Sequence, residues 1–353
     1  MGINTNFWLN RSVFLTGHTG FKGGWLTLWL SFMGAKVSGY SLEPPTNPSF
    51  FKENNLTDFL ENSTFNDIQN FVSLKNAIKI SKPSVIIHMA AQPLVKKSYI
   101  EPQETYLTNI MGTVNLLEAA RAVDTVEAII NVTTDKCYEN IEQIKAYNEN
   151  DKLGGYDPYS SSKACAELVS ASYRNSFLKD NNIKLATVRA GNVIGGGDWA
   201  SDRLIPDVFR NINKNKKLYV RSPNAIRPWQ HVLEPLSGYL ILAEKLVTFG
   251  DNYAEAWNFG PEENESKTVK WVIEYLSQKI PNIDWEIDKS INTHEASFLL
   301  LDSSKAKSKL NWKPKWPLKI ALDKTIEWYI DWEKNKKMSD VSISQIKSFD
   351  NLF

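Results

Sequence analysis

Cysteine, long apolar runs and excess charge of one sign are all scarce in this sequence of 353 residues. There are two cysteines, Cys137 and Cys165, and neither belongs to a CxxC pair or a Cys/His cluster. Their placement excludes a disulfide framework and predicts that the protein holds no zinc or other metal. No apolar run approaches the roughly 20 residues that a membrane-spanning helix needs. The formal net charge is +1, which gives no electrostatic reason to expect nucleic acid or an anionic membrane as partner.

The first ten residues are polar and lead directly into a strand pattern, so they do not have the composition of a signal peptide. Together with the unpaired cysteines, this predicts a cytoplasmic protein with no membrane or nucleic-acid partner. Residues 338–353 are also polar, and we expect them to be loosely attached.

The first half of the chain alternates β-rich runs with helical patterns. Strands are expected at residues 11–16, 36–41, 85–89, 126–132 and 183–189, and helices at 24–33, 73–80, 104–123 and 158–178. This alternation predicts an α/β fold with a Rossmann-like, doubly wound parallel sheet. The pattern is less regular after residue 190. We therefore expect a dinucleotide-binding domain over residues 1–190, with returning segments near 225–260, and a smaller α/β substrate-binding domain over 191–353.

A glycine-rich turn, TGHTGFKG (16–23), follows the first expected strand and precedes the first helix. Glycines at positions 17, 20 and 23 let the backbone turn tightly and approach a pyrophosphate, whose charge a helix N-terminus stabilises. A glycine triplet by itself is weak support, but the position between strand and helix is the context that dinucleotide binding requires. A plain tight turn is the alternative.

The second expected strand ends in Gly39-Tyr40-Ser41-Leu42, where an acidic residue usually binds the adenine ribose. Without that carboxylate we expect a weaker hold on the ribose and a less constrained choice between NAD and NADP. Asp67 is a candidate contact to the adenine, with an ordinary surface turn as the alternative.

Tyr159 and Lys163 lie four residues apart at the start of an expected helix, after Asp157 at the N-cap and Pro158 at the first helical position. Both side chains project from one face of the helix. An ammonium near a phenol favours the phenolate and lowers its reference pKa of about 10. A tyrosinate could then remove a hydroxyl proton while the carbon passes hydride to a nicotinamide. Alone, the pair fits a solvated helix face; after a dinucleotide turn, we expect it to be catalytic.

These motifs, in their order, resemble the extended short-chain dehydrogenase/reductase superfamily, which combines TGxxGxxG with YxxxK. Over about residues 8–335 the sequence is similar to the CDP-D-glucose 4,6-dehydratase family within it. The motifs that carry the resemblance are GHTGFKGGW (17–25), HMAAQPLV (88–95), TTDKCYEN (133–140), YSSSKACAE (159–167), RAGNVIGGGDW (189–199), DRLIPD (202–207) and RPWQHVLEP (227–235).

The resemblance implies a lyase that uses NAD and converts CDP-D-glucose to CDP-4-dehydro-6-deoxy-D-glucose, for deoxysugar and O-antigen lipopolysaccharide biosynthesis. It implies contacts to NAD from Gly17, His18, Thr19, Gly20, Phe21, Lys22, Gly23, Ser41, Asp67, Ile68, Ala90, Ala91, Tyr159 and Lys163. It implies contacts to the substrate from Gln92, Asn192, Arg203, Arg227 and His294. For His294 a surface position is the alternative, and for Trp199 the choice is between the substrate pocket and the core.

The resemblance also implies roles at the strand end after residue 132. Tyr159, assisted by Lys163, would take the proton of the 4-hydroxyl, which Thr134 orients. Asp135 would then protonate the leaving 6-hydroxyl and Lys136 would take the proton of carbon 5, although the two roles could be exchanged or shared. The dTDP-glucose dehydratases have Thr-Asp-Glu at this point. A lysine, with a reference pKa of about 10.4, must be desolvated or crowded by a cation to act as a base.

Three further expectations concern supporting residues and association. Asn109 matches a position that supports the active site, with a helix-surface amide as the alternative, and His88 is expected to be a core residue. Members of the family dimerise through the helices that begin near residues 104 and 158, as a four-helix bundle. An apolar stripe of Ile110, Val114 and Leu117 is consistent with that, or could face the sheet.

Other readings of the sequence remain open. A 4-epimerase or another nucleotide-sugar dehydratase would share the Tyr–Lys pair, and an epimerase would not need the acid and base after Thr134. A non-catalytic NAD-binding regulator would be expected to have lost Tyr159 or Lys163.

Overall fold

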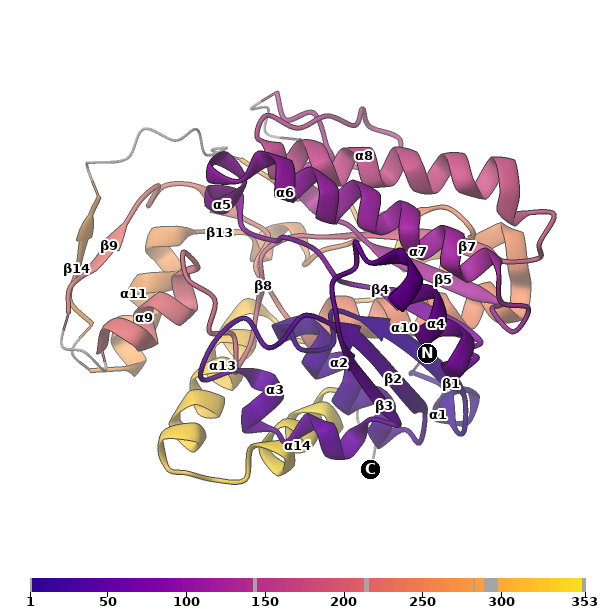
Figure 1. Cartoon of the computed structure of the whole chain (residues 1–353). Coiled ribbons are helices and arrows are strands. Elements are labelled where there is room, and N and C mark those ends of the chain that lie inside the picture. Colours follow the sequence, from indigo (N-terminus) through magenta and orange to yellow (C-terminus); the bar gives the residue numbers. More distant parts are fainter. Residues whose placement is uncertain (1, 142–144, 213–215, 282, 289–297, 351–353) are drawn as a thin grey trace.

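The computed structural model describes residues 2–141, 145–212, 216–281, 283–288 and 298–350, and its centre is a parallel sheet (Figure 1). Seven strands lie in the order β12-β7-β5-β4-β1-β2-β3. They are β1 (Ser12–Thr16), β2 (Lys36–Ser41), β3 (Asn62–Phe65), β4 (Val85–His88), β5 (Ala128–Val132), β7 (Lys184–Ala190) and β12 (Ala256–Phe259). This order reverses direction beside β1, and it confirms the predicted Rossmann-like fold.

Helices cover both faces of the sheet, and alternate side chains of each strand serve the two cores. Val85 and Ile87 of β4 belong to one buried cluster, whereas Ile86 belongs to the other. The first cluster includes side chains of α2 (Phe21–Phe32) and α10 (Leu233–Phe249), and the second includes side chains of α4 (Phe71–Ser81) and α7 (Gly112–Arg121). Because parallel strands are buried on both faces, they read as nearly continuous apolar runs in the sequence.

The expected helix over residues 104–123 is present but is not a regular α-helix throughout. It consists of α6 (Pro102–Tyr106), a π-helical segment η2 (Leu107–Met111) and α7. The neighbouring α8 (Pro158–Tyr173) begins as expected, with the Asp157 side chain accepting a hydrogen bond from Ser160 N, and ends in a second π segment, η4 (Arg174–Leu178). In the expected apolar stripe, Leu117 is buried in the core, whereas Ile110 and Val114 are only half-buried.

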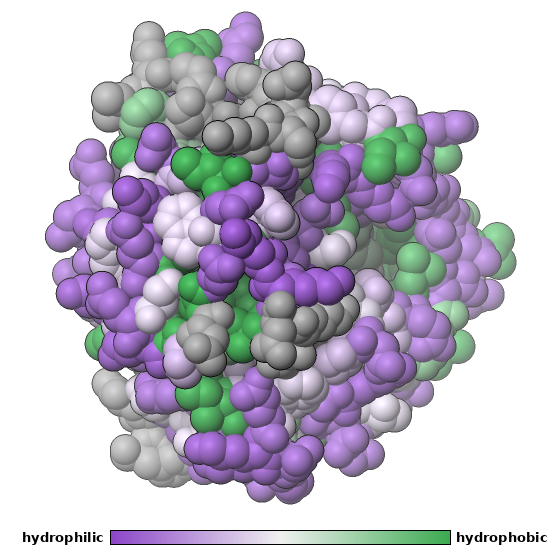
Figure 2. Space-filling view, turned by 90° about the vertical axis from the view of Figure 1, so that its left-hand side faces the viewer, coloured by the Kyte–Doolittle hydropathy of each residue, from purple (hydrophilic) through white to green (hydrophobic). Residues whose placement is uncertain are grey.

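The segments beyond β7, together with β6, form short sheets and helices next to the carboxyl ends of the main strands. The paired strands are β8 (Val193–Ile194) with β11 (Gln230–His231), β9 (Leu218–Val220) with β14 (Trp285–Ile287), β10 (Ile226–Arg227) with β13 (Lys267–Thr268), and β6 (Ala146–Tyr147) with β15 (Leu300–Leu301). The helices are α9 (Leu204–Ile212), α11 (Val269–Lys279), α12 (Ser304–Lys309) and α13 (Leu318–Glu333). The side of the molecule that carries α9, β9 and β14 is mainly hydrophilic, with separate hydrophobic patches (Figure 2). The division into two domains near residue 190 stays a prediction.

Shorter elements complete the chain. They are α1 (Thr5–Trp8), α3 (Phe50–Glu53), α5 (Val95–Ile100), η1 (Leu56–Phe59), η3 (Asp135–Cys137), η5 (Gly250–Tyr253) and η6 (Glu263–Glu265). Within the described ranges, no helix combines the length and the apolar character needed to cross a membrane.

The expectation that the C-terminal segment is loosely attached is wrong for residues 338–350. They form α14 (Met338–Asp350), in which Ile346 and Phe349 are buried. The Phe349 ring contacts the rings of Trp29 and Trp316, and Lys315 Nζ lies 2.7 Å from Asp350 Oδ1. The polar composition misled because a docked helix needs only one apolar face.

Candidate active site

A cavity of about 1180 Å³ lies at the carboxyl ends of the main strands, where ligands bind in open α/β sheets. It extends from the glycine turn of residues 17–23, past the ends of β4 and β5, to α9 and β9. Pockets for one small ligand have volumes of about 300–1000 Å³. The cavity is therefore large enough for two ligands at once.

The glycine turn forms a cradle that side chains would fill. Gly17 has a φ of +77°, and a Cβ there would lie 2.8 Å from the backbone nitrogen of Ala90. A Cβ on Gly23 would lie 2.0 Å from the carbonyl oxygen of Gly17. The N-cap of α2 is Gly20, which has no side chain to form a capping hydrogen bond. The first N–H groups of the helix are therefore available to an anion. The turn thus fits a dinucleotide pyrophosphate.

The structure assigns His18 a different position from the one expected. His18 is buried and does not line the cavity; its Nε2 lies 2.8 Å from Ser63 Oγ, and its ring lies against Phe51 and Phe65. A Cβ on Gly39 would lie 2.4 Å from this ring, so the glycine in β2 makes room for it. Burial lowers the pKa of His18 to about 4, so the ring is neutral. His18 braces the turn from behind in place of the expected contact to NAD.

The other expected cofactor residues do line the cavity. They are Gly17, Thr19, Gly20, Phe21, Lys22, Gly23, Ser41, Asp67, Ile68, Ala90 and Ala91. Thr19 Oγ1 lies 2.8 Å from Ser41 Oγ, which links the turn to the end of β2. Asp67 Oδ1 accepts a hydrogen bond of 2.8 Å from Gln69 N, so one of its oxygens shapes the local turn.

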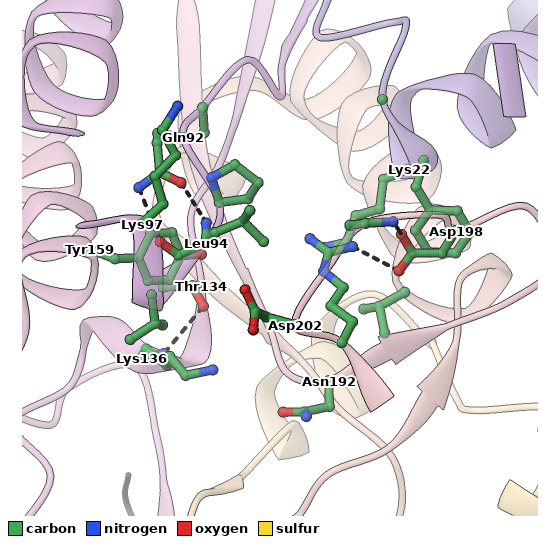
Figure 3. Close-up of a pocket in the computed structure, with 18 of the residues that line it drawn as sticks. Lys22, Gln92, Leu94, Lys97, Thr134, Lys136, Tyr159, Asn192, Asp198 and Asp202 are labelled. Carbon is green, nitrogen blue, oxygen red and sulfur yellow. Dashed lines mark hydrogen bonds and ion pairs between the residues drawn. The ribbon is translucent and has the colours of Figure 1, made fainter. Parts of the chain in front are cut away.

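Lys22 is a half-buried cation that lines the cavity (Figure 3). Burial, together with the charges of Arg203 and Lys163, lowers the pKa of Lys22 to about 8. In the described part of the chain it has no ion pair. An anionic ligand such as a dinucleotide phosphate would supply the missing countercharge.

Thr134, Asp135 and Lys136 form a tight turn directly after β5. Thr134 Oγ1 lies 3.1 Å from Asp135 Oδ1 and accepts a hydrogen bond of 3.4 Å from Lys136 N (Figure 3). Asp135 is buried, and burial raises the pKa of its carboxyl. Its Oδ2 has no hydrogen-bond partner within the ranges described. A buried carboxyl with a raised pKa is suited to hold a proton and give it to a leaving group.

Tyr159 and Lys163 enter the same cavity from α8, but their electrostatics differ from expectation. Lys163 Nζ donates a hydrogen bond of 3.1 Å to Val132 O, the last carbonyl of β5. Burial raises the pKa of Tyr159 to about 12, although a hydrogen bond with Thr134 lowers it. Burial also lowers the pKa of Lys163 to about 8. The expected lowering of the tyrosine pKa is wrong, because desolvation of the phenolate outweighs the Thr134 hydrogen bond and the charge of Arg203.

Sequence reasoning missed a buried ion pair beneath these residues. Arg189 and Glu167 are each 3% exposed, and Arg189 Nη2 and Nε lie 2.8 and 3.0 Å from the two oxygens of Glu167. Thr133, directly after β5, and Thr187, in β7, also donate to Glu167. Arg189 Nη1 donates a hydrogen bond of 2.8 Å to Tyr138 OH. The only signal in the sequence was that both residues fall inside quoted motifs.

On the substrate side, Asn192, Arg203 and Arg227 all line the cavity. Arg203 Nη1 forms an ion pair of 2.8 Å with Asp198 Oδ2, and Arg227 is buried with Nη1 donating to Ile226 O at 3.0 Å. Both guanidinium groups are thus held by the protein beside the cavity. His294 lies outside the described residues.

Gln92 and Asn109 form one buried network. Asn109, in the π segment η2, accepts from Gln92 N at 2.8 Å and donates to Gln92 O and Ser162 Oγ at 3.1 and 2.8 Å. The alternative of a helix-surface amide is therefore wrong. Gln92 lines the cavity, but its side chain binds Thr105 Oγ1 and the backbone of Leu94 (Figure 3). This arrangement favours a structural role for Gln92 over the expected substrate contact.

The structure also places His88, Trp199 and the possible metal ligands. His88 is buried with Nδ1 2.7 Å from Thr16 Oγ1, and burial lowers its pKa to about 3, so it is a core residue as expected. Trp199 satisfies both alternatives, since it lines the cavity and packs on the rings of Tyr329 and Trp332. No group of three or more His, Cys, Asp or Glu that could hold a metal occurs in the residues that the structure describes.

Comparison with known proteins defines the family. The sequence model of the GDP-mannose 4,6 dehydratase family matches residues 14–325. The chain belongs to this family. It is 49% identical to CDP-glucose 4,6-dehydratase of Salmonella typhimurium over 98% of both chains. The predicted membership of the nucleotide-sugar dehydratases, which are hydro-lyases of the extended short-chain dehydrogenase/reductase superfamily, is thus confirmed.

Two solved structures illustrate the shared fold of these dehydratases and their relatives. The dTDP-glucose 4,6-dehydratase of Bacillus anthracis in complex with NAD aligns with a TM-score of 0.75 at 23% identity, over 93% of this chain and 98% of that one. The UDP-glucose 4-epimerase of Thermotoga maritima with UDP-glucose aligns with a TM-score of 0.74 at 22% identity, over 91% and 99%. At these identities the likeness concerns the fold, which dehydratases and epimerases share.

The buried pair generates a prediction about stability. We expect Arg189→Met to lower the free energy of unfolding by about 3 kcal/mol or more, because it leaves the Glu167 carboxylate buried and unpaired. The double variant Glu167→Gln/Arg189→Met should lose less than the sum of the single losses. Equilibrium urea unfolding of the native protein and all variants measures the free energies for this double-mutant cycle.

The exposed pair Glu139 and Lys152, whose atoms lie 2.9 Å apart, serves as the control. Its removal should change the free energy of unfolding by less than about 1 kcal/mol. If Arg189→Met cost no more than this control, the buried pair would not hold the structure together.

Proposed function

We propose that this chain is an NAD-dependent CDP-D-glucose 4,6-dehydratase that produces CDP-4-dehydro-6-deoxy-D-glucose. The observation that carries the proposal is the meeting of two chemical groups at one cavity. The Tyr159–Lys163 pair suits proton transfer at a carbinol, and the Asp135–Lys136 turn suits removal of water. The 49% identity to the CDP-glucose enzyme of Salmonella typhimurium supports the choice of substrate.

The glycine cradle of residues 17–23 would hold the pyrophosphate of NAD, and Ser41, Asp67, Ile68, Ala90 and Ala91 would line the path of its adenosine half. Lys22 would neutralise a phosphate, which would raise its own depressed pKa. NAD supplies, when bound, a hydride acceptor at the start of the cycle and a hydride donor at its end.

In the first step Tyr159 would accept the proton of the sugar 4-hydroxyl as carbon 4 is oxidised to a ketone. The pKa of about 12 must fall for this, and the Thr134 hydrogen bond and the charge of Arg203 act in that direction. Lys163 is held by Val132 O, so it can donate to a ligand hydroxyl without moving α8.

In the second step the ketone makes the proton on carbon 5 acidic. Lys136 would remove this proton, and Asp135 would protonate the 6-hydroxyl so that it leaves as water. Return of the hydride to carbon 6 and of a proton to carbon 5 completes the cycle without net oxidation. Asn192, Arg203 and Arg227 would bind the diphosphate, for which a guanidinium fork is well suited.

The alternatives explain less of the site. A 4-epimerase needs Tyr159 and Lys163, but it has no use for a buried carboxyl of raised pKa beside a lysine. A non-catalytic regulator has no use for either pair. We further propose a cytoplasmic enzyme of deoxysugar and O-antigen biosynthesis, because NAD and nucleotide sugars are made and used in that compartment.

A direct assay tests the substrate. The purified protein is incubated separately with CDP-glucose, dTDP-glucose and GDP-mannose, with and without added NAD, and the 4-keto product is followed by its absorbance in alkali. We expect turnover of CDP-glucose above the other two. Turnover of none would refute the enzyme, and turnover of only another nucleotide sugar would refute the substrate.

The assignment of Lys136 is tested by isotope exchange. We expect Lys136→Ala to lower kcat by about 100-fold or more and to abolish deuterium incorporation at carbon 5 in heavy water, since general-base groups contribute 10²–10⁴-fold. NMR of the sugar measures the exchange. Lys152→Ala, at a side chain that is 75% exposed, is the matched control. Full exchange in Lys136→Ala would show that another group is the base.

We also propose a homodimer through a four-helix bundle. The helix that runs from α6 to α7 lies beside the helix that runs from α8 to η4 (Figure 1). Exposed apolar side chains occur on both helices. They are Leu107, Met111, Leu168 and Phe177, which are 37–58% exposed. Association of two copies would cover them.

Sedimentation of the protein tests this association. Leu168→Glu should convert a dimer to a monomer at micromolar concentration, because it buries a charge in the interface. Ile80→Glu, on α4 and also exposed to solvent, should leave the dimer intact. A monomeric native protein, or a dimer that Leu168→Glu does not disturb, would contradict the proposal.

A further inference from the structure

The end of the cavity that lies away from Tyr159 is built by α9 and β9. Its lining includes Leu204, Pro206, Asp207, Leu218, Val220 and Arg221. If the proposed function holds, the sugar lies at Tyr159 and the diphosphate at Arg203 and Arg227. The nucleoside must then extend toward this end, where α9 begins one residue after Arg203.

Asp207 lies one helical turn beyond Arg203, and its N–H donates a hydrogen bond of 3.0 Å to Arg203 O. Its carboxylate is oriented by Arg210, whose Nη2 lies 2.7 Å from Asp207 Oδ1. Arg210 is itself anchored, because it donates to Trp199 O and Ala200 O, each at 3.0 Å. Asp207 is 31% exposed, and its Oδ2 makes no hydrogen bond to the described residues. One oxygen is therefore held while the other remains an acceptor at the cavity.

A guanidinium stands beside this acceptor. Arg221 follows β9, lines the same end of the cavity and donates to Asp202 O at 3.4 Å. Its charge acts on the Asp207 carboxylate. The end of the cavity thus presents an acceptor and a donor side by side.

Cytosine and uracil differ at the edge that would meet these groups. Cytosine has an amino group at position 4, a donor, and an unprotonated N3, an acceptor. Uracil and thymine have an oxygen at position 4, which accepts, and a protonated N3. A carboxylate attracts the amino group and repels the carbonyl oxygen, and a guanidinium can donate to the unprotonated N3 of cytosine but not to the protonated N3 of uracil.

We infer that Asp207, oriented by Arg210, accepts a hydrogen bond from the 4-amino group of the cytosine base and selects CDP-sugars against UDP- and dTDP-sugars. This inference rests on the proposed function and deepens it, since it assigns the base specificity to one carboxylate. The residues of the redox centre have no part in it.

The comparison of CDP-glucose with UDP-glucose tests the inference, because the two differ only at position 4 and N3 of the base. We expect Asp207→Asn to lower the ratio of kcat/KM for CDP-glucose over UDP-glucose by about tenfold or more, since its amide can turn a donor toward the uracil oxygen. The dissociation constants of CDP and UDP, measured by calorimetry without any turnover, should shift in the same direction. Asp207→Ser, which also removes the carboxylate, replaces Asp207→Asn if that variant does not fold.

Asp340→Asn is the matched control, because Asp340 also forms an ion pair with a cation three residues away, Lys337, but lies away from the cavity. Its CDP to UDP ratios should equal those of the native protein. Unchanged ratios in the Asp207 variants would overturn the inference and leave the dehydratase intact. If no nucleotide sugar were turned over, the proposed function would fail, and equal affinities of the native protein for CDP and UDP would overturn the inference separately.

Discussion

The buried contact between Glu167 and Arg189 constrains the active site more than any other interaction in the structure. Removing two charges from water costs several kcal/mol for each ion, and only complete pairing offsets that cost. Here the partners come from α8, from β7 and from the residue directly after β5, because Thr133 and Thr187 also donate to Glu167. None of these elements can shift without leaving a buried charge unpaired. The position of α8, and with it that of Tyr159 and Lys163, follows from this network.

A second network sets the opposite wall of the site. The π segment η2 turns Asn109 inward, where it binds both backbone groups of Gln92 and the hydroxyl of Ser162. A π segment adds a residue to a helical turn and commonly marks a functional site. The loop after β4 is thereby joined to α8 at a point between Tyr159 and Lys163. Both walls of the cavity are thus attached to the same helix, α8.

The charges around the cavity are unbalanced in a way that suits anionic ligands. Lys163 is buried and Lys22 is half-buried, and desolvation is the main cause that lowers the pKa of each to about 8. Arg203 and Arg227 line the same space, whereas Asp135 is a buried carboxyl whose pKa is raised. Diphosphates would supply the missing negative charge and restore the lysines toward their ordinary pKa.

Features that depend on neighbouring residues could be predicted from the sequence. Apolar runs located the strands, because both faces of a parallel sheet are buried. The glycines at 17 and 23 signalled a turn, since a Cβ at either position would meet backbone atoms. The spacing of Tyr159 and Lys163 placed both on one face of a helix. The strands β3 and β12 and the helix α14 were missed; the half-polar sequences of β3 and α14 fit a loop as well as a docked element.

The sequence by itself thus determined five of the seven sheet strands, the glycine turn and the candidate catalytic residues, because each depends on local spacing. Only the tertiary structure decided the environment of those residues. It turned His18 away from the cavity, joined Gln92 to Asn109, raised the pKa of Tyr159 and paired Glu167 with Arg189, 22 residues later. Burial and hydrogen bonding depend on which distant segments come into contact, and local patterns in the sequence do not show those contacts.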